Sequence, residues 1–228
     1  MKHILTGALL VAAITFGWPA RATQTNTVNL TPEVAIPVGN PIGVTEQFTV
    51  SGATGVVSDV QVTLNIAGGF NGNLYAYLVN PEGQLAVLLN RVGVTGSNPF
   101  GYSDPGFDIT LDGNAASNIH GYGSGYSVNG SSQVTGTWAA DGRNISPTSS
   151  GSLFDSTPTT DGLNVFVDTA ATGVWTLFVA DLSSGGGTAD LNDVGITVMT
   201  APEPGTWALF GGGLVALFFR RPRRTAKV

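Results

Sequence analysis

The chain has 228 residues, of which 42% are hydrophobic, 11% are charged and 32 are glycine. This length and composition suit one domain of short strands joined by many turns. The chain has no cysteine, which excludes disulfides and thiolate metal sites. Seven of its nine basic residues lie in the first 21 or last nine positions, so residues 23–204 keep two arginines against fifteen acidic residues, a formal charge of −13. Such a body repels nucleic acid and anionic lipid and attracts divalent cations, so nucleic-acid binding is excluded.

The first 22 residues have the three parts of a secretory signal peptide. Lys2 gives a basic start, an apolar stretch follows at 4–18, and Ala20-Arg21-Ala22 gives the small-x-small ending of a cleavage site. We expect cleavage after Ala22, so residues 1–22 are a signal peptide and the protein is exported. The alternative is an uncleaved membrane anchor, which is disfavoured because the apolar stretch is shorter than the roughly 20 residues of a spanning helix.

Residues 23–200 form the body, in which short β-rich runs are separated by Gly, Asn, Asp, Ser and Pro. Alternating apolar residues predict a strand at 60–66. Strands at 74–79 and 85–89 flank the turn at 80–83, where Pro81 and Gly83 fit successive turn positions. Further strands are expected at 107–111, 163–167, 174–180 and 194–198. Several short strands spaced by turns imply two antiparallel sheets packed face to face.

The stretch 113–160 differs from the rest of the body because Gly, Ser, Asn and Thr dominate it. We expect a long loop excursion with one strand near 133–138. Loops of this length are usually functional or mobile.

The last 28 residues, 201–228, form a separate unit. Pro202, Glu203 and Pro204 precede an apolar run at 205–219. Fifteen helical residues span only about 22 Å, less than the ~30 Å hydrocarbon core, but snorkelling arginines and local bilayer thinning cover the difference. The charges that follow the run are Arg220, Arg221, Arg223 and Arg224. They stay cytoplasmic under the positive-inside rule, which places the body outside.

This tail resembles the PEP-CTERM sorting signal, which has Pro-Glu-Pro, an apolar helix with a glycine cluster, and a terminal arginine run in the same order. The resemblance implies that a membrane-embedded exosortase cuts the chain near Pro202–Pro204 after transient anchoring in the inner membrane. The mature protein then reaches the cell surface or the extracellular space. Bearers of such tails are typically Gram-negative species that make extracellular polysaccharide. The alternative is a permanent single-span anchor.

Three stretches of the body, 57–93, 106–115 and 173–198, resemble the proprotein convertase P domain. The resemblance implies a jelly-roll β-sandwich without catalytic residues, a module that stabilises the catalytic domain of subtilisin-like proteases. Asn73 stands where the family often has Asp, and Gly113 replaces the second Asp of a common pair, so no family ion site is carried over. The predicted fold is therefore all-β: a jelly-roll-like antiparallel β-sandwich, flanked by an N-terminal signal peptide and a C-terminal transmembrane sorting helix.

Two groups of aspartates are candidate calcium ligands, because Ca²⁺ takes six to eight oxygens from carboxylates, carbonyls and water. They are Asp104, Asp108 and Asp112 in one segment and Asp181, Asp190 and Asp193 in another. Three glycines at 185–187 are expected to bring backbone carbonyls close to the second group. The alternative is that these aspartates cap turns and keep the surface soluble.

Four aromatic residues in or beside Gly-rich loops are candidate glycan contacts, because flat rings stack on sugar rings. They are Tyr102, Tyr122, Tyr126 and Trp138. Tyr75 and Tyr77 share one face of a predicted strand, so the two rings either both pack in the core or are both exposed.

Catalysis is not expected. His120 is the only histidine between 23 and 200, and no Gly-x-Ser-x-Gly elbow is present. Glycosidases use a pair of carboxylates, and Asp108 and Asp112 share one face of a predicted strand, but no cleft or aromatic subsite accompanies them in the sequence.

The expected function is a non-enzymatic structural, adhesive or polysaccharide-binding role in an exopolysaccharide or biofilm matrix, with extracellular polysaccharide or surface proteins as partners. The alternative is an accessory P-domain module for a separately encoded, secreted subtilisin-like protease. A third class, a hydrolase, would depend on His120 or Asp108.

Overall fold

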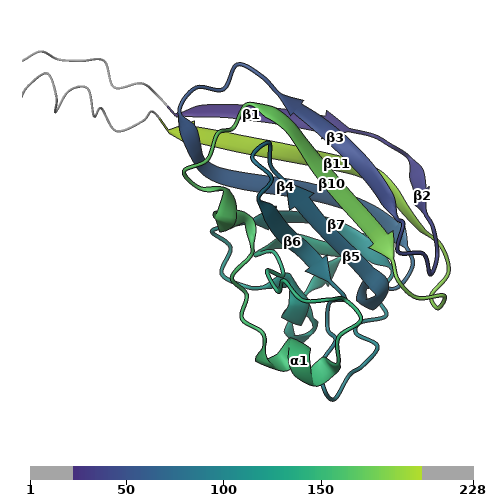
Figure 1. Ribbon diagram of the computed structural model, residues 1–228. Coiled ribbons are helices and arrows are strands. Elements are labelled where there is room, and N and C mark those ends of the chain that lie inside the picture. The colour runs from purple at the N-terminus through teal and green to yellow at the C-terminus, as the bar shows by residue number, and fades with distance from the viewer. Residues whose placement is uncertain (1–22, 202–228) are drawn as a thin grey trace, which may run out of the picture.

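Alternating apolar residues give most strands of this chain one side that avoids water. The computed structural model describes residues 23–201, and there eleven strands form two β-sheets that lie face to face (Figure 1). Both sheets and the core between them lie within this stretch, so residues 23–201 form a complete sandwich.

The larger sheet has seven strands and the smaller sheet has four. In spatial order, the larger sheet contains β1 (Gln24–Leu30), β11 (Ala189–Ala201), β4 (Val56–Gly68), β7 (Gly106–Asp112), β9 (Val134–Trp138) and β8 (Ser127–Val128), while β2 (Val34–Ile36) also pairs with β11. The smaller sheet contains β3 (Val44–Val50), β10 (Gly173–Asp181), β5 (Leu74–Val79) and β6 (Leu85–Asn90). The pair β7–β9 is parallel, and the other paired strands are antiparallel.

The core fills the space between the two sheets, where Trp175 is the largest fully buried side chain. Its indole Nε1 donates a hydrogen bond to the carbonyl of Ala171 at 2.9 Å, and its ring meets Phe166 edge-on at a centroid distance of 5.0 Å. Buried aromatic residues contribute large apolar areas, and Trp also needs a partner for its N–H. Both requirements are met at this position.

The antiparallel β-sandwich prediction is confirmed as two facing sheets, and the predicted strands are confirmed except one. The stretch 163–167 was expected to be a strand, but it forms the 3₁₀-helix η3 (Leu163–Phe166). Leu163 and Phe166 are both buried and lie three positions apart, which suits one 3₁₀ turn. Packing of these two side chains therefore overrides the strand propensity of Val165. The jelly-roll connectivity stays a prediction.

The excursion at 113–160 is richer in structure than expected. It contains the 3₁₀-helix η2 (Ile119–Ser124), β8, β9 and the helix α1 (Gly151–Ser156), which lies at the lower end of the molecule (Figure 1). Its later part covers the outer edge of β6, because Asp141 N and Gly142 N donate to the carbonyls of Leu88 and Val87, both at 3.0 Å. The edge of the smaller sheet at β6 is thus closed. A further 3₁₀-helix, η1 (Asn71–Asn73), precedes β5.

The predicted signal peptide and sorting helix lie outside the described residues. Within residues 23–201, no helix is long and apolar enough to cross a membrane.

Replacing Trp175 by alanine is expected to lower the free energy of unfolding of 23–204 by about 3–5 kcal/mol, the usual cost of truncating a buried aromatic side chain. Urea denaturation followed by circular dichroism measures this loss. Val174→Ala is the matched control, since Val174 lies next to it on β10 but is 46% exposed, and a change of only about 0.5 kcal/mol is expected there. Equal losses in the two variants would contradict the assigned orientation of β10.

Candidate functional site

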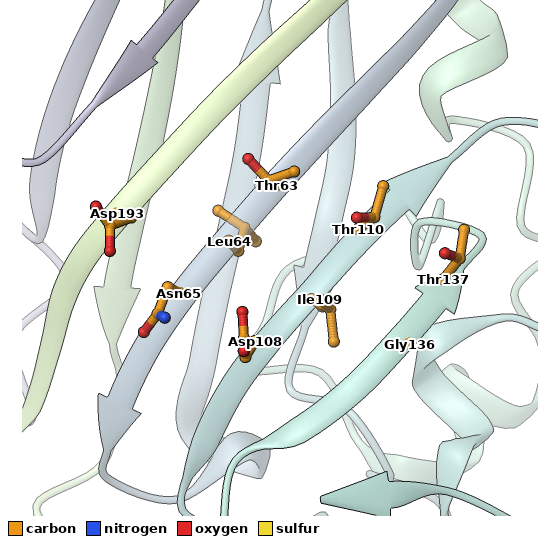
Figure 2. A pocket seen from close by; sticks show the side chains of 9 residues that line it. All are labelled: Thr63, Leu64, Asn65, Asp108, Ile109, Thr110, Gly136, Thr137 and Asp193. Carbon is orange, nitrogen blue, oxygen red and sulfur yellow. The ribbon is translucent and has the colours of Figure 1, made fainter. Parts of the chain in front are cut away.

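A polar groove lies on the outer face of the larger sheet (Figure 2), with a volume of about 400 Å³. It crosses β11, β4, β7 and β9, the four central strands of this sheet. Its lining residues are Thr63, Leu64, Asn65, Asp108, Ile109, Thr110, Gly136, Thr137 and Asp193.

Strand register brings the polar side chains of the groove into two rows. In one row, Asn65 pairs with Asp193 on one side and with Asp108 on the other, and Figure 2 shows it between them. In the other row, Thr63 is paired with Thr110, which is paired in turn with Thr137. Neighbouring strands lie about 4.8 Å apart, so the groove presents a regular array of carboxylate, amide and hydroxyl groups.

Hydrogen bonds within the groove orient Asn65. Its Oδ1 accepts from Gln133 Nε2 at 2.9 Å and from Asn192 Nδ2 at 3.3 Å. With the oxygen held by two donors, the amide nitrogen is left to donate outward, between the carboxylates of Asp108 and Asp193. The groove therefore places a hydrogen-bond donor, the amide of Asn65, between two acceptors, the carboxylates of Asp108 and Asp193.

A glycine opens the space beside these rows. A Cβ at Gly195 would collide with Thr63 Oγ1 and Asn29 Oδ1. Gly195 also pairs with Thr63 in the register of β11 and β4. Its lack of a side chain lets the polar groups of neighbouring strands approach over β11.

The structure places the first group of predicted calcium ligands along one strand and the loop before it, with separate partners. Asp104 accepts from the hydroxyls of Tyr122 and Tyr126 at 2.9 and 2.8 Å. Asp108 lies in the polar groove, and Asp112 accepts from Gln61 Nε2 at 2.9 Å. Nowhere in residues 23–201 do three or more His, Asp or Glu side chains come together as a metal-binding group.

The second predicted group is divided between the two sheets. Asp190 and Asp193 lie on β11, whereas Asp181 ends β10 in the smaller sheet. Asp181 is fully buried; its Oδ1 accepts from Ser183 N at 3.0 Å, while its Oδ2 has no hydrogen-bond partner. Burial raises the pKa of this carboxyl.

The four predicted glycan contacts come together around Tyr122. Ring-centroid distances from Tyr122 are 4.5 Å to Tyr102, 5.1 Å to Tyr126 and 6.3 Å to Trp138. Tyr122 is only 1% exposed and Trp138 9%, whereas Tyr126 is 41% exposed. Burial raises the pKa of the Tyr122 hydroxyl, which also accepts from Asn71 Nδ2 at 3.1 Å. The cluster therefore packs mainly on itself and offers one well-exposed ring.

Another group of aromatic rings lies on the outer face of the smaller sheet. Tyr77 stacks on its cross-strand neighbour Phe178 at 4.8 Å, and Tyr75 lies 5.8 Å from Tyr77. All three side chains are half-buried. The two tyrosines thus share one face, as their spacing predicts.

His120 makes a buried hydrogen-bonded contact with Asp141 that the sequence did not reveal. Its Nδ1 lies 2.7 Å from Asp141 Oδ2 and its Nε2 lies 2.9 Å from the carbonyl oxygen of Val94. Asp141 is fully buried and also pairs with Arg143 at 3.1 Å. Both ring nitrogens of His120 face acceptors, so neither is available to take a proton from a substrate.

A second hollow, of about 500 Å³, lies beside this contact. Its lining residues are Ser117, Asn118, His120, Gly121, Ser124, Gly125, Trp138 and Arg143. The hollow joins the edge of the aromatic cluster to the contact between His120 and Asp141. Sequence reasoning missed Asp141 and Arg143 because the two positions lie 21 and 23 residues after His120 in a loop without periodic pattern.

Comparison with known proteins identifies the class of the chain through its C-terminus. The PEP-CTERM protein-sorting motif matches residues 200–224. This motif implies an exported protein that is anchored transiently in the membrane and processed by an exosortase-type enzyme. No curated protein matches the chain.

Two solved structures are similar to the body at low identity. One is the crystal structure of the Aeromonas sobria serine protease with its chaperone, at 14% identity and a TM-score of 0.46, covering 81% of this chain and 28% of that chain. The other is the crystal structure of the Aeromonas sobria serine protease, at 14% identity and a TM-score of 0.43, covering 80% and 28%. The chain therefore spans less than a third of the length of either.

His120→Ala is expected to lower the free energy of unfolding by about 2 kcal/mol, because it removes the shorter of the two hydrogen bonds to Asp141 Oδ2 and leaves only Asn90 N at 3.2 Å. Chemical denaturation of 23–204 measures the loss. Ser124→Ala, an exposed position in the same helix η2, is the control and should change stability little. Unchanged stability in His120→Ala would show that the contact between His120 and Asp141 does not hold the excursion.

Proposed function

We propose that the exported body is a non-enzymatic, polysaccharide-binding component of the extracellular matrix and that the polar groove is its binding surface. The observation that supports this proposal is the double row of hydrogen-bonding side chains across four adjacent strands. A sugar hydroxyl donates one hydrogen bond and accepts others, so it matches a surface where Asn65 lies between two carboxylates. The regular strand spacing presents these groups along an extended path rather than in a closed pocket.

Charge favours an uncharged polysaccharide as the ligand. Asp108 and Asp193 contribute two carboxylates to the groove, and residues 23–204 carry a formal charge of −13. An anionic polymer would be repelled both locally and by the whole body. Neutral sugar hydroxyls instead donate hydrogen bonds to the carboxylates, which are stronger acceptors than neutral groups.

The positions of the titratable side chains support a non-enzymatic function. Both nitrogens of His120 are engaged with acceptors. Asp108 and Asp112 are four residues apart on one strand, which separates their Cα atoms by about 13 Å. Paired glycosidase carboxylates lie about 5–9.5 Å apart. The pair named from the sequence is therefore too widely spaced for that chemistry.

The alternative function, an accessory module for a separate secreted subtilisin-like protease, is supported by the sequence resemblance to the P domain. Co-purification of the body with a protease from its host would favour this alternative. The two proposals differ in their ligand, so polysaccharide binding by the isolated body separates them.

Thr110→Val is expected to weaken binding to an insoluble uncharged glucan about three- to tenfold, because a hydrogen bond contributes about 0.5–1.5 kcal/mol. Valine keeps the shape and strand propensity of threonine but removes the hydroxyl. Thr176→Val on the smaller sheet is the matched control. Co-sedimentation of purified 23–204 with cellulose, and with alginate as an anionic polymer, measures binding.

Three results of that experiment contradict the proposal. Equal effects of the two valine variants would show that the groove does not bind the glucan. Preferential binding to alginate would contradict the charge argument. Loss of binding only in Tyr126→Ala would move the site to the aromatic cluster. Release of reducing sugar from the bound glucan would contradict the non-enzymatic assignment.

We further propose that calcium, where it binds, is held at Asp181. The residues present fit the ion in one respect: a buried carboxylate oxygen without a hydrogen-bond partner is a suitable hard ligand. The Gly-rich loop that follows Asp181 contains the Gly185 carbonyl, which accepts from Asn73 Nδ2 at 2.7 Å. Calcium would compensate the buried negative charge at this position.

Calcium is therefore expected to raise the melting temperature of 23–204 relative to EDTA, and Asp181→Asn is expected to abolish this response. Burial raises the pKa of Asp181 in the folded protein above its value in the unfolded chain. The folded protein therefore loses stability as the pH rises from the unfolded-state pKa through the raised folded-state pKa. Asp181→Asn should consequently melt higher than the wild type in EDTA at neutral pH. Asp190→Asn is the control and should keep the calcium response. Identical wild-type melts in calcium and EDTA would reject the site.

A further inference from the structure

One edge of the larger sheet is formed by β1, a strand of seven residues, together with the three-residue strand β2, since both pair with β11. β1 pairs with β11 without any register shift from Gln24 to Leu30. Within residues 23–201, its backbone makes no hydrogen bond outside this ladder. Every second N–H and C=O group of β1 therefore points away from the sheet, which is a template for pairing with another strand.

At its first residue β1 is met by a loop, because Thr54 donates from N and Oγ1 to Gln24 Oε1, both at 2.9 Å. The rest of β1 lacks the features that usually block such pairing. Proteins protect edges with lysine, proline, bulges, very short strands or covering loops. The sequence of β1, QTNTVNL, has no charge and no proline, and its pairing has no bulge. The other edge of the larger sheet is β8, which has only two residues. In the smaller sheet, the excursion covers the edge strand β6 through Asp141 and Gly142.

We propose that β1 pairs antiparallel with β1 of a second copy of this chain, so that the two larger sheets become one continuous sheet. The net charge of the body opposes contact between two copies, so the place where they meet must be locally uncharged. Two bodies of formal charge −13 repel each other, and an uncharged edge is the place where they approach at least cost. The pairing is isologous, with the same strand on both sides, as in most symmetric dimers.

The strand sequence suits a two-fold axis at its central residue, Thr27. Antiparallel pairing about this axis sets Thr27 opposite Thr27 of the partner subunit and Thr25 opposite the partner's Asn29. These three side chains are exposed and share one face of β1, and cross-strand threonine pairs are favourable. Thr27 Oγ1 already lies 3.0 Å from Thr197 Oγ1, so the pairing extends an existing hydroxyl ladder across the interface.

The absence of cysteine from the chain allows a direct test of this register by engineered cross-links in 23–204. Directly opposed strand residues have Cα atoms about 4.5–5.5 Å apart, within the range that a disulfide bridges. Under mild oxidation, Thr27→Cys is expected to give a covalent dimer. Thr25→Cys and Asn29→Cys are expected to cross-link when mixed, but not when oxidised separately. Thr176→Cys, on a central strand of the smaller sheet, is the control and should stay monomeric.

Sedimentation equilibrium gives the second measurement. The wild-type body is expected to associate to a dimer as its concentration rises, and Thr27→Lys is expected to raise the dissociation constant at least about tenfold because it opposes two like charges. Thr176→Lys should leave the constant unchanged. A wild-type monomer at all concentrations, or equal cross-linking of Thr27→Cys and Thr176→Cys, would overturn the proposal. Circular dichroism melts of each variant exclude misfolding as the cause of lost association.

Discussion

Val62, Leu64 and Ile66 of β4 are buried against the smaller sheet, and the rest of the structure depends on this contact between two apolar faces. A strand that gives alternate side chains to the core must give the others to water. Thr63 and Asn65 therefore face outward because their neighbours face inward. The polar groove is in this sense a consequence of the core.

Buried polar side chains attach the irregular parts of the chain to this sandwich. Asn71 is fully buried; its Oδ1 accepts from Gly106 N at 2.9 Å and its Nδ2 donates to Gly106 O at 3.1 Å. The pair His120–Asp141 does the same for the excursion that covers β6. Buried polar groups are costly unless each is satisfied, so these contacts specify one arrangement of loops that are otherwise rich in glycine and serine.

The sequence predicted the regular part of the fold because periodicity carries that information. Strands such as 74–79 and 85–89 have apolar alternation and a clear turn between them. The short edge strands β2 and β8 were missed because two or three residues cannot show a period, and β1 was missed because Thr and Asn mask its alternation. The stretch 163–167 was assigned wrongly because Val165 and Val167 favour strands, while the contacts that select a 3₁₀ turn come from distant segments, such as Trp175 against Phe166.

The candidate site was less predictable than the fold for a related physical reason. Asp108 was named from the sequence, but its grouping with Asn65 and Asp193 depends on the register of three strands that are far apart in the chain. The only sequence evidence for the groove was that Thr and Asn residues alternate with apolar residues along β4 and therefore face outward. Aromatic residues in loops were expected to face ligands, whereas Tyr122 is buried because its ring fills space beside Phe107, 6.0 Å away.

The positions of the groove and of the open edge on the same sheet have a consequence for affinity. A shallow groove whose hydrogen bonds compete with water gives modest affinity at each site. Antiparallel pairing of β1 about a two-fold axis perpendicular to the sheet would place both grooves on one face of the joined sheet. A long polymer that occupies one groove then meets the second at a high effective concentration. Weak individual sites and a self-pairing edge would together suit the proposed matrix role, because they would hold repetitive polymers firmly through many contacts while each contact stays reversible.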